Sequence, residues 1–282
     1  MGGIVKVYRE WKLSGDDEWL KSVLPRLEKG IDYITSDPKR WDSAHGLVKR
    51  GYTIDTWDFT YMPDAGTNRR IEPGKTPMAI MHGDNTGVYQ AMRQLAEMNR
   101  ALGRTENAAD WERRAAELKA NVMRHLWNGR YFVHQKFFDG ERGIDNFEDV
   151  RLSLSDAYAL NRGILSLAER QSIVDEYQSR RKTTKAFAEW FTVDPPYVPR
   201  FGRHPAGEYV NGAISPFTAG ELALGAFGCG REAYGWDILE RFMRKVERDG
   251  NVYFLYNPAN GESISASIGP SAWGAAALLN AI

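Results

Sequence analysis

The chain has 282 residues, of which 43% are hydrophobic, so it can bury one large core. Its 37 basic and 37 acidic residues balance, which argues against nucleic acid or an anionic membrane as a partner. No apolar run approaches the roughly 20 residues of a membrane-spanning helix, and the first residues lack the apolar stretch of a signal peptide. These features predict a soluble cytoplasmic protein. The single cysteine, Cys229, cannot form an internal disulfide and is expected in the core.

Apolar residues recur at helical spacing in four pairs of segments. The expected helices cover residues 4–13 and 16–35, 85–102 and 106–126, 154–165 and 168–180, and 217–228 and 231–246. A ninth, unpaired helix is expected at 270–282. In the first pair, Ser14 or Asp16 is suited to cap the second helix, and Gly15 to end the first. The pattern predicts helical hairpins with very short turns.

Long segments rich in Gly, Pro, Asp and aromatic residues separate the hairpins, at 37–83, 129–153 and 181–215. Loops of such length are usually functional, and their recurrence predicts one rim of a helical ring. Short β pieces are expected within the irregular segments at 130–134 and 252–256. No Pro/Ser-rich linker divides the sequence, so residues 1–282 are expected to form a single domain.

Several motifs in chain order resemble those of one enzyme group. They are the N-terminal run around Tyr8-Arg9 and Ser14-Gly15-Asp16, the closing Leu126-Trp127-Asn128-Gly129, the loop Tyr209 to Pro216, and the C-terminal stretches 256–262 and 271–279. The group is the six-hairpin glycosidases, which include glycogen-debranching and glucosylglycerate-hydrolase-like enzymes. The resemblance implies an all-α protein with an (α/α)6-type toroid. With nine expected helices where that toroid has twelve, the chain looks like the barrel without its N-terminal helices.

Glycoside hydrolysis needs two carboxyl groups, one protonated and one ionised. The loop after the first hairpin places Asp55 and Asp58 on either side of Trp57. The resemblance assigns the general acid to Asp55 or Asp58, and Trp57 could raise a carboxyl pKa by desolvation. Tyr52 and Trp57 are expected to contact the sugar, since aromatic rings suit its apolar face. The alternative is that both aspartates accept hydrogen bonds from loop backbone amides.

The second carboxylate is harder to place. Many relatives have a Glu two residues before the Tyr of the C-terminal motif, and Phe254 occupies that position here. Glu208, in a rim loop expected to face the sugar, is the predicted catalytic base, and Glu262 comes next. Both are alternatively solvated surface carboxylates. In that case the protein binds sugars without cleaving them.

Four further residues are predicted to bind substrate. His82 and Asp84 precede an expected helix, where Asp84 is explained more simply as its N-cap. His82 suits hydrogen bonds to sugar hydroxyls. Asn211 and Trp273 belong to two of the motifs above, and by resemblance they line the sugar site.

Other chemistries are not supported by the sequence. Its five histidines show no metal-ligand spacing, and no phosphate-binding glycine loop or Gly-x-Ser-x-Gly turn occurs. We therefore expect no metal and no cofactor.

The sequence thus predicts a glycoside hydrolase that cleaves a small glucoside or oligosaccharide, with inversion, using Asp55 or Asp58 as acid and Glu208 as base. One alternative is a carbohydrate-binding or inactive remnant of such an enzyme. Another is a sugar epimerase or polysaccharide lyase on the same toroid, because fold alone does not decide the chemistry. The sequence does not indicate an oligomeric state.

Overall fold

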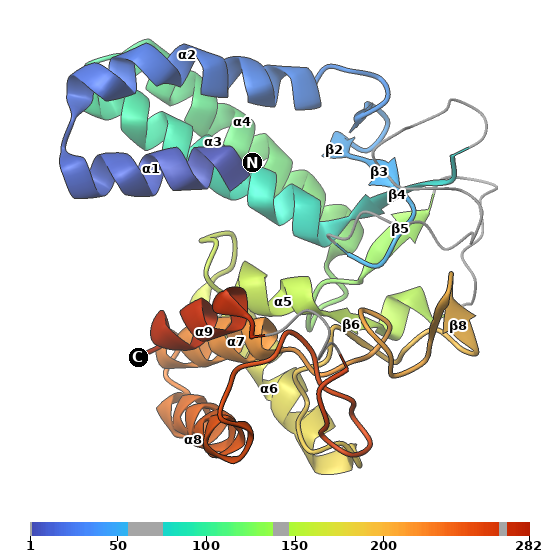
Figure 1. Cartoon of the computed structure of the whole chain (residues 1–282). Helices are drawn as coiled ribbons and strands as arrows, with labels where there is room; N and C mark the ends of the chain where they lie inside the picture. The colour runs from blue at the N-terminus through green and yellow to red at the C-terminus, as the bar shows by residue number, and fades with distance from the viewer. Residues whose placement is uncertain (1, 56–75, 138–146, 265–269) are drawn as a thin grey trace.

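A computed structural model describes residues 2–55, 76–137, 147–264 and 270–282 (Figure 1). Within these ranges the chain is predominantly helical, which confirms the expected all-α class. The helices are α1 (Gly2–Ser14), α2 (Asp17–Ile34), α3 (His82–Ala101), α4 (Thr105–Leu126), α5 (Leu154–Ala159), α6 (Leu167–Thr183), α7 (Pro216–Phe227), α8 (Glu232–Asp249) and α9 (Ala272–Leu279), with a 3-10 turn at Glu148–Val150. None of the described helices is long and apolar enough to cross a lipid bilayer.

The helices form an inner and an outer row. The odd-numbered helices contact one another in chain order, α1 to α3, α3 to α5, α5 to α7 and α7 to α9. Even-numbered helices pack on the outside, most closely in the hairpins α3–α4 and α7–α8. In Figure 1, α1 to α4 form one side of the molecule and α5 to α9 the other. This is a toroid-type arrangement of helical hairpins.

The turn residues of the first hairpin act as the sequence predicts. The Asp16 carboxylate accepts a hydrogen bond from the Trp19 amide at 2.8 Å and caps α2. Gly15 has a φ of +66°, a left-handed conformation that glycine adopts without steric cost. The two helices therefore reverse within two residues.

Short strands gather at one end of the helices, on the right of Figure 1. They are β1 (Trp41–Asp42), β2 (Leu47–Val48), β3 (Arg50–Gly51), β4 (Met78–Met81), β5 (Gln135–Phe137), β6 (Leu152–Ser153), β7 (Val193–Asp194), β8 (Arg200–Phe201) and β9 (His204–Pro205). They pair antiparallel as β1–β2, β3–β4–β5, β6–β7 and β8–β9. All lie in the connections that lead from one hairpin to the next, so these connections form a rim.

The two β pieces expected from the sequence are wrong in position. Residues 130–134 make one isolated bridge, from Phe132 to Trp127, and the ladder starts later, at β5. The Asn128 side chain accepts hydrogen bonds from the amides of Arg130 and Tyr131, which ties the first of these residues into a local turn. Residues 252–256 likewise make only single bridges, at Tyr253 and Tyr256.

Close contact between α7 and α9 depends on a glycine. A Cβ added at Gly220 would lie 2.3 Å from the carbonyl oxygen of Ala277 and 2.8 Å from its Cβ. Both are far inside van der Waals contact, and one partner is backbone that cannot swing away. Gly220 therefore sets how closely two inner helices approach.

We expect Gly220→Ala to lower the free energy of unfolding by about 1–3 kcal/mol, because α9 must shift outward to accommodate the methyl group. Gly30→Ala is the matched control, since Gly30 lies within α2 and a Cβ there meets nothing within 4 Å. That change should stabilise the protein by about 0.5–1 kcal/mol. Urea unfolding of both variants gives the comparison, and an unchanged or raised stability of Gly220→Ala would contradict this packing.

Candidate active site

The inner helices enclose a cavity of about 680 Å³. Each inner helix contributes to its lining, with Arg9 from α1, Gln90 from α3, Tyr158 from α5, Glu221 from α7 and Trp273 from α9. The volume lies within the range of roughly 300–1,000 Å³ that small-molecule sites occupy. We call this space between the inner helices the ring cavity.

Small residues leave this space open. Gly87 on α3 and Ala276 and Ala277 on α9 line the cavity with little or no side chain. One helical turn away on α3 and α9, larger polar or aromatic side chains line the cavity. The lining therefore combines an unfilled volume with a few groups able to orient a ligand.

Glu221 is the carboxylate of this cavity, among the described lining residues. The Asn161 amide nitrogen donates hydrogen bonds to its Oε2 at 2.8 Å and to its backbone oxygen at 2.9 Å. Burial raises the pKa of Glu221, and the Asn161 hydrogen bond and the charges of Arg162 and Arg9 act in the opposite direction. The carboxyl group is thus held in place and has a higher pKa than an ordinary glutamate.

An aromatic wall lies beside Glu221. Trp273 stacks on Phe217 with ring centroids 4.3 Å apart and planes 8° apart, yet 47% of its surface remains exposed. Phe254 completes the wall, 5.5 Å from Phe217 and 6.1 Å from Trp273. The exposed part of the indole lines the cavity and is suited to stack on the apolar face of a sugar ring.

Arg162 connects the cavity with the start of α3. Its guanidinium donates hydrogen bonds of 2.7 Å to the Gly83 carbonyl and to Thr86 Oγ1. Glu221 and Asp55 both interact electrostatically with this group. A single cation therefore stands between the cavity and a second, buried polar network.

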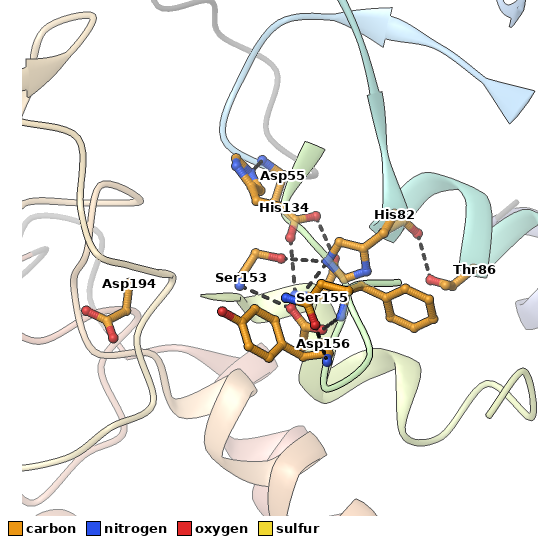
Figure 2. A network of polar contacts seen from close by, with 12 residues as sticks. Asp55, His82, Thr86, His134, Ser153, Ser155, Asp156 and Asp194 are labelled. Atoms are coloured by element: carbon orange, nitrogen blue, oxygen red, sulfur yellow. Dashed lines mark hydrogen bonds and ion pairs between the residues drawn. The ribbon is translucent and has the colours of Figure 1, made fainter. Parts of the chain in front are cut away.

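That network centres on Asp55 (Figure 2), a buried residue with an unusual φ of +45°. Its carboxylate accepts hydrogen bonds from Ser155 Oγ at 2.5 Å and from the Ser155 amide at 3.2 Å. Its own amide donates to His134 Nε2 at 3.0 Å. Burial alone would raise the pKa of Asp55, but the neighbouring His82 and His134 and the serine hydrogen bonds lower it. The site favours an ionised carboxylate.

His82 and Asp156 lie on the other side of the network. His82 Nε2 lies 2.8 Å from Ser153 Oγ, and the imidazole stacks on Phe132. Burial lowers the pKa of His82 to about 3, so the ring is neutral at ordinary pH. Asp156 caps α5 through the Ser153 amide, and burial raises its pKa well above the usual range.

A further buried carboxylate, Glu148, is held by several donors. Tyr197 donates to its Oε1 at 2.5 Å, His134 Nδ1 lies 2.8 Å from Oε2, and Arg151 forms an ion pair with it at 3.1 Å. Since His134 Nε2 accepts the Asp55 amide proton, its Nδ1 is the nitrogen that donates to Glu148. Glu148 thereby fixes the ring that in turn holds Asp55.

These features stand in a chain whose sequence matches, over residues 4–273, the profile of the mannosylglycerate hydrolase MGH1-like glycoside hydrolase domain. The chain belongs to this family. A comparison with curated proteins gives no match.

Solved structures share the fold of this MGH1-like chain at low identity. A GH63 mannosylglycerate hydrolase from Thermus thermophilus, in complex with glucose, is 16% identical with a TM-score of 0.54, over 72% of this chain and 47% of that one. An uncharacterized conserved protein from the same organism is 15% identical with a TM-score of 0.65, over 99% and 76%. A GH78 family rhamnosidase of Bacillus sp. GL1 is 19% identical with a TM-score of 0.63, over 98% and 25%. This chain spans about half the length of the mannosylglycerate hydrolase.

Two residues predicted to bind substrate lie at the start of α3. His82 is fully buried in the Asp55 network. The prediction that Asp84 is an N-cap is wrong, because α3 begins at His82 directly after β4, with Met81 as the extended cap residue. Asp84 lies inside the first turn instead, 3.5 Å from the Arg50 guanidinium. Burial raises its pKa, while the Arg50 charge lowers it.

The other predicted residues are dispersed. Tyr52 is buried, with its hydroxyl 3.4 Å from Glu148. The side-chain amide of Asn211 forms hydrogen bonds with the backbone of Tyr197 and His204. Glu208 and Glu262 lie exposed in rim turns. Of the predicted binding residues, Trp273 alone lines the ring cavity in the described part of the chain. Trp57 and Asp58 lie outside the described residues.

Sequence reasoning missed Glu221, Arg162 and Glu148. Glu221 carried a readable signal, since it is the lone charged residue in the otherwise apolar stretch 216–227. Arg162 had none, because its partners lie far away in the chain, and Glu148 had little, because Tyr197 is 49 positions away. Among residues 2–55, 76–137, 147–264 and 270–282, no three His, Cys, Asp or Glu side chains converge as metal ligands would.

The neutral His82 makes stability depend on pH. The unfolded chain binds a proton at His82 near its ordinary pKa of 6.5, whereas the folded protein does so only near 3. The free energy of unfolding should therefore fall as pH drops from 6.5 toward 3, by up to about 1.4 kcal/mol per pH unit from this residue. Urea unfolding at pH 7.5 and 5.5 should show a smaller difference for His82→Gln than for the unsubstituted protein. Equal differences would contradict a neutral buried His82.

Proposed function

We propose that the chain is a glycoside hydrolase whose substrate occupies the ring cavity. The observation that carries this proposal is the cavity itself, in which an exposed indole and polar side chains from all the inner helices converge. Membership of a glycoside hydrolase family supports the same chemistry. The reaction breaks a glycosidic bond with one protonated and one ionised carboxyl group.

Of the two aspartates proposed for the general acid, Asp55 is poorly suited to the role, which leaves Asp58 as the candidate. An acid must be protonated before the leaving group departs, which requires a raised pKa. The environment of Asp55 lowers its pKa, and two hydrogen bonds from Ser155 occupy its carboxylate. We assign Asp55 to holding the base of the rim, with Ser155 and His134. For the catalytic base, the sequence offers Glu208 as the first candidate and Glu262 as the second.

The charge of the cavity suits a substrate with a carboxylate. Lys6, Arg9 and Arg162 line it, against the single carboxylate of Glu221 among the described lining residues. A relative with this fold is named as a mannosylglycerate hydrolase and was solved with D-glycerate. We propose a small glycoside of a hydroxy acid such as glycerate as the substrate class.

Turnover of a substrate panel tests the function. Glucosyl- and mannosylglycerate, maltose-type sugars and aryl glycosides should be incubated with the purified chain, and release of free sugar measured. We expect hydrolysis of at least one compound, reduced about tenfold or more in kcat/KM by Trp273→Ala through the loss of ring stacking. Trp236→Ala is the control, because Trp236 is exposed on α8 outside the cavity lining. Binding without turnover would favour the inactive remnant, and epimerised or unsaturated products would favour the rival enzymes.

The charge of the substrate is tested separately. For a glycerate glycoside, Arg9→Ala should raise KM several-fold, and added salt should raise the KM of the unsubstituted protein because it screens the attraction. Neither change should affect the matching glycerol glycoside, which lacks the carboxylate. Arg26→Ala on the exposed side of α2 serves as control. Equal KM effects on both substrates would contradict recognition of the carboxylate.

A further inference from the structure

We propose that Glu221 on α7 is the catalytic base that activates water in the ring cavity. The proposal rests on the proposed function, and it replaces Glu208 and Glu262 in that role. Glu221 does not belong to any of the rim motifs discussed above. The assignment follows from its place in the cavity.

Glu221 presents a usable carboxylate oxygen to the cavity. Asn161 holds Oε2 at 2.8 Å, while no hydrogen bond from the described residues reaches Oε1. The side chain lines the cavity and is only partly buried. One oxygen is thus anchored and the other is available to accept a proton from water.

Two other buried carboxylates, Asp55 and Glu148, are occupied. Asp55 accepts two hydrogen bonds from Ser155, and Glu148 is held by Tyr197, His134 and Arg151. Neither of them lines the ring cavity. Donors of the buried network hold both carboxylates, and neither lines any of the described cavities.

Glu221 lies one helical turn from an aromatic wall that includes Phe254. Phe217 lies four residues earlier on α7, so the two side chains share one helix face. Phe217 stacks on Trp273, and Phe254, which stands at the position of the usual glutamate, packs against both rings. Aromatic side chains therefore occupy the rim position where the usual glutamate would stand. The carboxylate lies one helical turn further into the ring.

The charged groups around Glu221 suit a base. Burial strengthens it as a proton acceptor by raising its pKa, whereas Asn161, Arg162 and Arg9 favour the ionised form. Tyr158 faces the same carboxylate, and burial and the charge of Glu221 raise the pKa of its hydroxyl, which therefore remains a hydrogen-bond donor. A base works best when its pKa approaches the working pH from below.

The proposed reaction is an inverting hydrolysis. Glu221 takes one proton from water, and the water oxygen forms a bond to the anomeric carbon while the bond from that carbon to the leaving oxygen breaks. The electron pair of that bond goes to the leaving oxygen, which receives its proton from the general acid. The products are the free sugar and the aglycone alcohol.

Glu221→Gln keeps the shape and the Asn161 contact but removes the base. We expect kcat/KM to fall about 100-fold or more, equally for poor leaving groups and for dinitrophenyl glycosides, because a missing base slows both. Glu221→Asp should retain partial activity. Glu247→Gln is the control, since Glu247 is exposed on α8, and Glu208→Gln tests the competing assignment. Thermal unfolding checks that each variant is folded.

Azide gives a readout that a structural role would not produce. With Glu221→Ala, azide should occupy the vacated space and form the glycosyl azide of inverted configuration, which product analysis detects. Near-normal turnover by folded Glu221→Gln, or loss of turnover confined to Glu208→Gln, would overturn the assignment while the proposed function stands. Absence of turnover by the unsubstituted protein on every substrate would overturn both.

Discussion

The Arg162 guanidinium joins the ring cavity to the buried polar network around Asp55. It lies just beyond α5, hydrogen-bonds the first turn of α3 through Gly83 and Thr86, and faces Glu221 across the ring cavity. A buried cation is stable only when neighbouring acceptors and charges compensate for lost water. The hydrogen bonds of Arg162 therefore hold the start of α3 close to the end of α5.

The same crowding explains the glycine between His82 and Asp84. A Cβ at Gly83 would lie 2.2 Å from Ser155 Oγ and 2.6 Å from an oxygen of Asp55. Only the absence of a side chain allows Asp55 and Ser155 to meet against the helix. The residues around Gly83 thus form a packed support for the buried network of Asp55.

Features encoded by neighbouring residues could be predicted from the sequence. Helical periodicity located the hairpins, and Gly15 and Asp16 set the first turn through contacts within a few residues. Features that depend on distant partners could not. Asp84 has the composition of an N-cap, but its place is decided by β4 running directly into α3 and by Arg50, 34 positions away.

The candidate site shows the same division. Trp273 was predicted and lines the cavity, whereas Asp55 was predicted as an acid and lies in an environment that favours its ionised form. That environment comes from His82, His134 and Ser155, and the sequence places the last two 79 and 100 positions further on. Glu221 is the exception, because a single acid in an apolar inner helix is a local signal that points inward.

A crystal structure with a bound sugar tests whether the ring cavity is the substrate site. We expect a sugar ring stacked on the exposed part of Trp273, with an oxygen within hydrogen-bond distance of the Glu221 carboxylate. A sugar bound instead at the exposed turn that carries Glu208, with the ring cavity empty, would contradict it.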